Sequence, residues 1–169
     1  MVPVARSLAV VNGGDSASIH RFLEETVLGW RANGVKVAGV TAHPHGSPDR
    51  KCTAGILRDI GSGIPIQIYL ETSLPGTTCD LDRDGVDAAC ATVIDQIAGS
   101  DVVVLSKFGK LEAMRQGLFP AFEAAIAAGR PIVTTVSTKH RDAWNSFAPD
   151  ATYIDSDEVA LTEWLARQS

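Results

Sequence analysis

Apolar residues along this chain fall into two alternating patterns: short unbroken runs, and longer stretches in which they recur every three or four positions. The unbroken runs predict parallel strands buried on both faces, because such strands are apolar at every position. The spaced stretches predict amphipathic helices, as in Phe22, Val27 and Trp30. The expected strands are 7–11, 35–41, 101–105, 131–137 and 151–154, and the expected helices are 19–33, 81–98, 111–129, 138–147 and 158–167.

Strands that alternate with helices predict right-handed crossovers and hence a doubly wound α/β fold, in which helices cover both faces of a mainly parallel sheet. One pair of runs departs from this alternation. Residues 52–60 and 64–70 are both extended and are joined by Gly-Ser-Gly, so we expect an antiparallel β-hairpin inserted beside the parallel strands. Pro65 favours a sheet edge or a strand start, because it has no N–H to donate. Pro120 is expected to kink or split the helix 111–129.

Composition limits the class of protein. The chain has 169 residues, 45% of them hydrophobic and 21% charged, so a single domain over residues 1–169 is expected to bury a core without disulfides or metal. A formal net charge of −5 argues against a general nucleic-acid or anionic-membrane surface, although a local cationic pocket remains compatible with it. The chain has three cysteines without a CxxC pair, and it has no apolar span or signal sequence. These features predict a cytoplasmic protein. We expect it to be a monomer or a small homo-oligomer.

The first expected strand breaks into a loop of small residues that leads directly into a helix. Ser16 or Ser18 is expected to cap this helix, which places the loop at a positive helix N-terminus suited to phosphate or another oxyanion. The P-loop pattern GxxxxGK[ST] is not met, because from Asn12 it puts Ser18 at the lysine and Ile19 at the hydroxyl position. A bound triphosphate would therefore lack its main β/γ-phosphate contact. The expected anion-binding residues of the loop are Asn12, Gly13, Gly14, Asp15, Ser16, Ala17 and Ser18.

Polar residues also follow the central strand, at the carboxyl end where open α/β sheets bind ligands. Ser106, Lys107 and Lys110 are expected to join the anion site. Glu112 is the candidate catalytic residue, which would orient water. Because both loops follow parallel strands, we expect them on the same rim of the sheet. The alternative is that the lysines are solvated surface charges and that Glu112 only favours the first turn of the next helix.

Histidine and cysteine residues do not reproduce a metal site. His43 and His45 are separated by one residue, with Cys52 and Cys79 farther along the chain, and this matches no recognised zinc spacing. No metal ligands are therefore assigned. Soft sulfur beside an oxyanion pocket would suit molybdenum or tungsten, but the chain offers isolated thiols rather than a ligand set. Cys90 falls in the apolar pattern of its helix and is expected in the core.

The order of elements and three short motifs resemble an uncharacterised bacterial domain family of unknown function. That family is typified by Asn-Lys-Phe-Gly-Lys-x-Glu, and residues 106–112 read Ser-Lys-Phe-Gly-Lys-Leu-Glu, with serine in place of asparagine. Residues 79–82 (Cys-Asp-Leu-Asp) and 143–147 (Ala-Trp-Asn-Ser-Phe) are similar to its Cys-x-Leu-Asp and Trp-x-x-Phe motifs. The resemblance covers nearly the whole chain. It implies a molybdenum-uptake or nitrogen-fixation gene context rather than an activity.

More remotely, the arrangement is similar to the small nucleoside-triphosphatase family, which has a P-loop, an inserted hairpin and a strand ending in Asp-Glu-Ile-Gly-x-x-Glu. This resemblance implies a fold of the P-loop NTPase type. Ser106 and Lys107 occupy the positions of the acidic pair that would hold magnesium, while Gly109 and Glu112 match the family. With the loop lysine also missing, the resemblance carries over the fold more readily than the triphosphatase activity.

Three functions remain open. The first is a binding module that holds a nucleotide, phosphate or other oxyanion without efficient hydrolysis, with Lys107 or Lys110 supplying the missing cation. The second is an active nucleoside-triphosphatase or nucleotide kinase in which Glu112 orients water. The third is a structural or interaction protein with a vestigial pocket. The expected partner is a phosphate-containing small molecule or oxyanion, with no nucleic acid and no membrane, and no cofactor can be read from the chain.

Overall fold

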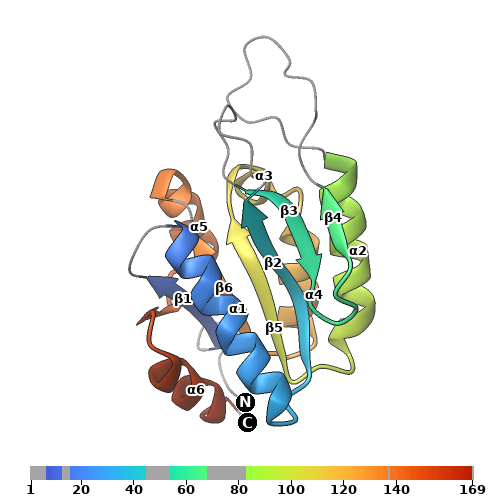
Figure 1. The fold of residues 1–169 in the computed structure, drawn as a ribbon. Coiled ribbons are helices and arrows are strands. Elements are labelled where there is room, and N and C mark those ends of the chain that lie inside the picture. Colours follow the sequence, from blue (N-terminus) through green and yellow to red (C-terminus); the bar gives the residue numbers. More distant parts are fainter. Residues whose placement is uncertain (1–6, 13–15, 45–53, 68–82, 137, 169) are drawn as a thin grey trace.

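The fold is given by a computed structural model, which describes residues 7–12, 16–44, 54–67, 83–136 and 138–168. The strands form a seven-stranded sheet in the order β4-β3-β2-β5-β6-β1-β7 (Figure 1). They are β1 (Leu8–Asn12), β2 (Val37–Pro44), β3 (Ala54–Asp59), β4 (Pro65–Gln67), β5 (Val102–Phe108), β6 (Ile132–Val136) and β7 (Thr152–Asp155). The helices are α1 (Ser16–Ala32), α2 (Arg83–Ile97), α3 (Lys110–Ala113), α4 (Phe119–Ala127), the 3₁₀-helix η2 (Thr138–His140), α5 (Arg141–Phe147) and α6 (Glu158–Ala166).

Most of the sheet is parallel, as the alternation of strands and helices predicts. β1 pairs in parallel with β6 and β7, and β5 pairs in parallel with β2 and β6. β5 therefore lies inside the sheet, which confirms the prediction from its unbroken apolar run. A mostly parallel α/β sheet of this kind is compatible with a P-loop-like fold.

Two neighbouring strand pairs at one side of the sheet are antiparallel. β3 pairs antiparallel with β2 and also with β4, where Leu57 lies opposite Ile66. Pro65 begins β4 at the sheet edge, as expected for a residue that has no N–H. The outer ends of the two predicted runs, 52–53 and 68–70, lie outside the described residues. The interpretation of this unit as an insertion into a parallel fold stays a prediction.

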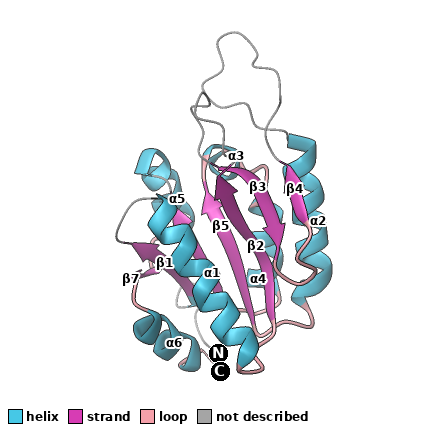
Figure 2. Ribbon diagram, viewed as in Figure 1, coloured by secondary structure: helices cyan, strands magenta, loops and turns pink. Residues whose placement is uncertain are grey.

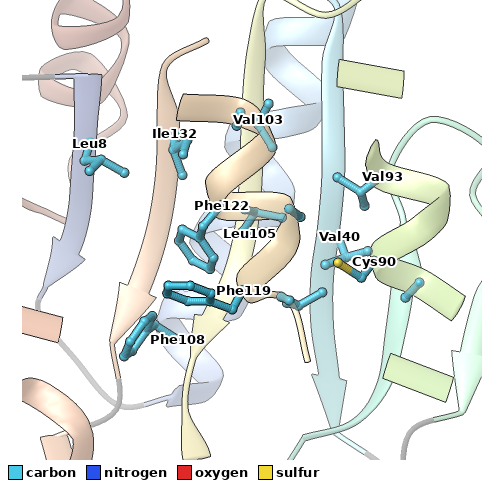
Figure 3. Close-up of a cluster of buried hydrophobic side chains, with 14 of the residues drawn as sticks. Leu8, Val40, Cys90, Val93, Val103, Leu105, Phe108, Phe119, Phe122 and Ile132 are labelled. Carbon is cyan, nitrogen blue, oxygen red and sulfur yellow. The ribbon is translucent and has the colours of Figure 1, made fainter. Parts of the chain in front are cut away.

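Helices cover both faces of the sheet, and each face has its own apolar core (Figure 2). On one face, α1 and α6 bury Trp30 and Leu161 with Val104 of β5. On the other face, α2, α4 and α5 cover Leu105, and Phe122 of α4 packs in the same cluster (Figure 3). Successive strand residues point to opposite faces, which is why Val104 and Leu105 belong to different cores.

The helix expected over 111–129 is two helices. α3 ends at Ala113, and α4 begins at Phe119 with Pro120 in its first turn. Proline is tolerated there because an N–H in the first turn has no partner within the helix. The predicted split is therefore correct, but the break lies before Pro120, in a turn where Arg115 and Gly117 have φ values of 60° and 63°.

Candidate functional site

Parallel pairing brings the carboxyl ends of β1, β5 and β6 to one rim of the sheet. Asn12 ends β1, and residues 106–107 lie near the end of β5, so the carboxyl ends of these two strands lie at the same rim (Figure 2). β6 separates the two, which the sequence did not indicate. Two strand spacings place the ends of β1 and β5 about 10 Å apart.

The connections that leave β1 and β6 depart to opposite faces of the sheet. α1 follows β1 and packs on the face that holds Val11 and Val133. α5 follows β6, and its Trp144 packs on the opposite face with Val10. In open α/β sheets, ligands bind outside the strand ends at such a topological switch point. The ends of β1 and β6 therefore mark the candidate site.

An arginine from α5 lies beside the last residue of β1. Arg141 Nη2 donates to Asn12 Oδ1 at 3.5 Å, and the exposed guanidinium lies over the Tyr153 ring of β7, 5.7 Å from its centroid. The Tyr153 hydroxyl donates in turn to Asn145 Oδ1 at 3.0 Å. These contacts hold a cation beside Asn12, the last residue of β1. α1 follows β1 in the chain, and a helix N-terminus carries partial positive charge, so the cation and the helix end both favour an anion.

Arg141 is not among the site residues expected from the sequence. It ends a basic run, Lys139-His140-Arg141. In the structure this run spans the last residues of η2 and the first residue of α5, immediately after the carboxyl end of β6. The parallel topology was the signal for it, since every βα connection of such a sheet opens on the same rim.

The end of β5 is irregular. Leu105 lies opposite Thr134 of β6, whereas Phe108 lies opposite Val136, so β5 has one more residue than β6 over this stretch. A bulge of this kind changes the direction of the side chains that follow it. Phe108 consequently returns to the same core as Leu105, and Ser106 is buried at 0% exposure.

The other predicted anion ligands are described only in part. Lys107 lies in the bulge and Lys110 begins α3, but their side chains are outside the described part of the structure. The same is true of residues 13–15 and of the side chains of residues 16–17, which begin α1. Ser18 is exposed in the first turn of α1. The roles of these residues stay predictions.

Glu112 stabilises the connection that follows β5 by accepting hydrogen bonds from its main chain. The residue is buried, with 6% exposure. Its Oε1 accepts a hydrogen bond from the Gly109 N–H at 2.9 Å, and its Oε2 accepts one from the Leu118 N–H at 2.8 Å. Each carboxylate oxygen therefore satisfies a buried main-chain donor, one before α3 and one before α4. This geometry gives no support to the predicted water-orienting role of Glu112.

The described residues contain no group of three or more His, Cys, Asp and Glu side chains that could hold a metal ion. His45, Cys52 and Cys79 lie outside the described ranges, as does the side chain of His43. Within the same ranges, none of the helices has the length and apolar character needed to cross a membrane.

Comparison with protein families gives a match over most of the chain. The model of a family described as "Protein of unknown function (DUF2478)" matches residues 8–164. The chain belongs to this family. Membership in a family without an assigned function agrees with the expectation from the sequence.

One curated relative carries a functional name. The chain is 38% identical over 90 residues to "Molybdenum import ATP-binding protein ModC 2" of Bradyrhizobium diazoefficiens. The match covers 53% of this chain and 10% of that protein, so it spans a small part of the relative. It supports a remote relationship of the chain to P-loop proteins. No solved structure matches the chain.

Proposed function

We propose that the protein binds a phosphate-containing small molecule, such as a nucleotide, or another oxyanion at the rim between β1 and β6, and that it does not hydrolyse this ligand efficiently. The observation that carries the proposal is the Arg141 guanidinium, whose Nη2 lies 3.5 Å from Asn12 Oδ1 at the carboxyl end of β1. Guanidinium groups bind phosphate through paired, charge-assisted hydrogen bonds. The start of α1 adds main-chain N–H donors.

Arg141 is proposed to supply the positive charge that a loop lysine supplies in P-loop proteins. In P-loop proteins that lysine approaches the β/γ-phosphates from the loop itself. In this chain, Arg141 comes from the connection after β6 and lies beside the end of β1, so we propose that the ligand does not depend on a loop lysine. Lys107 and Lys110 are proposed as further donors from the β5 side. The partial similarity to an ATP-binding protein supports a nucleotide as one ligand.

Binding without efficient turnover follows from the groups at the end of β5. The sequence has Ser106 and Lys107 where the small nucleoside-triphosphatase family has two carboxylates, so a magnesium ion would lack its expected ligands. The Glu112 carboxylate is occupied by two main-chain N–H groups. An active nucleoside-triphosphatase is therefore the less favoured alternative.

Calorimetry with inorganic phosphate, molybdate, ADP and ATP tests the proposal. We expect at least one of these probes to bind, and Arg141→Ala to weaken it about tenfold or more, the usual effect of losing a charge-assisted hydrogen bond. Arg167→Ala is the matched control, because it removes an equal charge from an exposed residue at the far end of α6 and should leave the affinity unchanged. ATP hydrolysis with magnesium should stay at background.

Two results would favour the alternatives. ATP or GTP turnover that Glu112→Gln abolishes in a folded protein would favour the enzyme. No response to any probe would favour a structural or interaction protein with a vestigial pocket.

A further inference from the structure

Two buried hydroxyl groups near the rim have no hydrogen-bond partner among the described residues. They are Ser106 Oγ, in a residue with 0% exposure, and Thr135 Oγ1, in a residue with 6% exposure. Buried hydroxyls are normally paired, because burial removes the water that would otherwise solvate them. Two hydroxyls without a partner in the described ranges, both at the carboxyl ends of parallel strands, are therefore candidates to bind a ligand.

The two hydroxyls lie on neighbouring strands and on the same face of the sheet. In β5, Val104 belongs to the core under α1 and Leu105 to the opposite core, so alternation places Ser106 on the α1 face. In β6, Val133 belongs to the core under α1, and Thr135 follows it by two positions. The two strands are in register up to Leu105, so Ser106 and Thr135 begin side by side at one strand spacing, about 5 Å.

The N-terminal half of α1 covers this part of the sheet. The buried positions of α1 include His20, Leu23, Val27 and Trp30, which share one helix face, and His20 is the one nearest the helix start. α1 leaves the end of β1, crosses β6 and β5 and returns to β2 (Figure 1). Thr135 therefore lies on the strand next to β1, beneath the helix end that is proposed to attract the anion.

We propose that Ser106 and Thr135 donate hydrogen bonds to an oxygen of the bound anion, either a phosphoryl group or a free tetrahedral oxyanion. The inference rests on the proposed function and adds the groups that contact the ligand from the sheet. A hydroxyl can donate one hydrogen, and an anionic oxygen accepts more than one. Neutral donors let the site hold an anion beside the positive helix end without burying a further charge. The same helix end disfavours a divalent cation at this position.

Removal of each hydroxyl tests the contact. Ser106→Ala and Thr135→Val remove the hydroxyl with little other change in shape. Thr26→Val is the matched control, because Thr26 Oγ1 is also buried and without a partner in the described part of the chain but lies farther along α1. All three variants should keep or raise the thermal midpoint, since each removes an unpaired buried polar group. Only Ser106→Ala and Thr135→Val should weaken binding of inorganic phosphate or ATP, by about tenfold each.

The two probes distinguish the source of the oxyanion. Equal losses for phosphate and ATP would assign the hydroxyls to a phosphoryl oxygen that both ligands share, whereas a loss for phosphate alone would assign them to a free oxyanion. Unchanged affinity in both variants, with Arg141→Ala still weakening binding, would overturn this inference and leave the proposed function intact. A lower thermal midpoint in both variants than in Thr26→Val would also overturn it, because the hydroxyls would then be paired in the free protein. A wild-type protein that binds neither probe would overturn both proposals.

Discussion

The Glu112 carboxylate packs directly against the Cα of Gly117, so a methyl group added to Gly117 would overlap one of its oxygens. Gly117 also has a φ of 63°, which L-amino acids with side chains adopt only at a cost. Glu112 in turn accepts the main-chain N–H groups of Gly109 and Leu118. The carboxylate and the glycine together fix the connection between β5 and α4.

Gly117→Ala should lower the free energy of unfolding by about 3 kcal/mol. About 1 kcal/mol of this loss comes from the positive φ, and the rest comes from displacement of a carboxylate that serves two buried donors. Gly129→Ala is the matched control, because Gly129 has a φ of 69° but nothing within 4 Å of the added carbon. This variant should lose only the part of the unfolding free energy that comes from the positive φ. Urea unfolding measures both losses. Equal losses would contradict the contact with Glu112.

Glu112→Gln should lower the free energy of unfolding by about 2 kcal/mol. The amide has one acceptor oxygen, so its NH₂ group faces one of the two main-chain N–H donors. Glu123→Gln, at an exposed position on α4, makes the same chemical change and should cost less than about 0.5 kcal/mol. If both variants unfold at the same urea concentration, the two main-chain hydrogen bonds that Glu112 accepts do not stabilise the fold.

Elements with a local sequence pattern were predictable. The unbroken apolar run at 102–105 identified an interior strand, and the spacing of Phe22, Val27 and Trp30 identified α1. Pro120 correctly indicated that one predicted helix is divided. In each of these cases the residues that determine the structure are neighbours in the chain, so periodicity and backbone chemistry are sufficient.

The arrangement of the site depends on distant contacts that periodicity does not encode. Arg141 and Asn12 are 129 residues apart, and they meet because β6 inserts between β5 and β1. The return of Phe108 to the core of Leu105 depends on a register shift that appears only when β5 is paired with β6. The role of Glu112 depends on a left-handed turn at Gly117, which returns the Leu118 N–H to the carboxylate. Charged residues near a strand end therefore predict which rim to consider, but they do not predict the contacts that each residue makes.

Cys90 should react slowly with thiol reagents. The residue is buried on α2, and burial raises the pKa of its thiol, with Asp87 and Glu112 adding to the rise against an opposing hydrogen bond to the Ala121 backbone. The thiolate is the reactive form, so both access and ionisation are reduced. In a protein with Cys52 and Cys79 replaced by serine, labelling at neutral pH should be at least about tenfold slower in buffer than in urea. Equal rates would place Cys90 at an accessible position.

The same raised pKa predicts a loss of stability in alkali. Above the unfolded thiol pKa of about 8.5, the unfolded chain loses this proton while the folded protein retains it. The contribution of Cys90 is therefore complete below that pH and is lost as the pH rises toward the folded pKa. Cys90→Ala should lack this part of the fall in unfolding free energy, measured in urea across the alkaline range in the same serine background. Parallel pH profiles would show that the thiol does not contribute.

Tyr153→Leu should weaken phosphate binding about two- to fivefold, because the ring supports the guanidinium through a cation–π contact at 5.7 Å from its centroid. This prediction rests on the proposed function. Tyr153→Phe keeps the ring and loses only the 3.0 Å hydrogen bond to Asn145, so its affinity should stay close to that of the wild type. Calorimetry with inorganic phosphate measures both variants. If the leucine variant binds as tightly as the wild type, the contact with Asn12 is sufficient to position Arg141, whereas equal losses in the two variants would assign the effect to the hydroxyl rather than the ring.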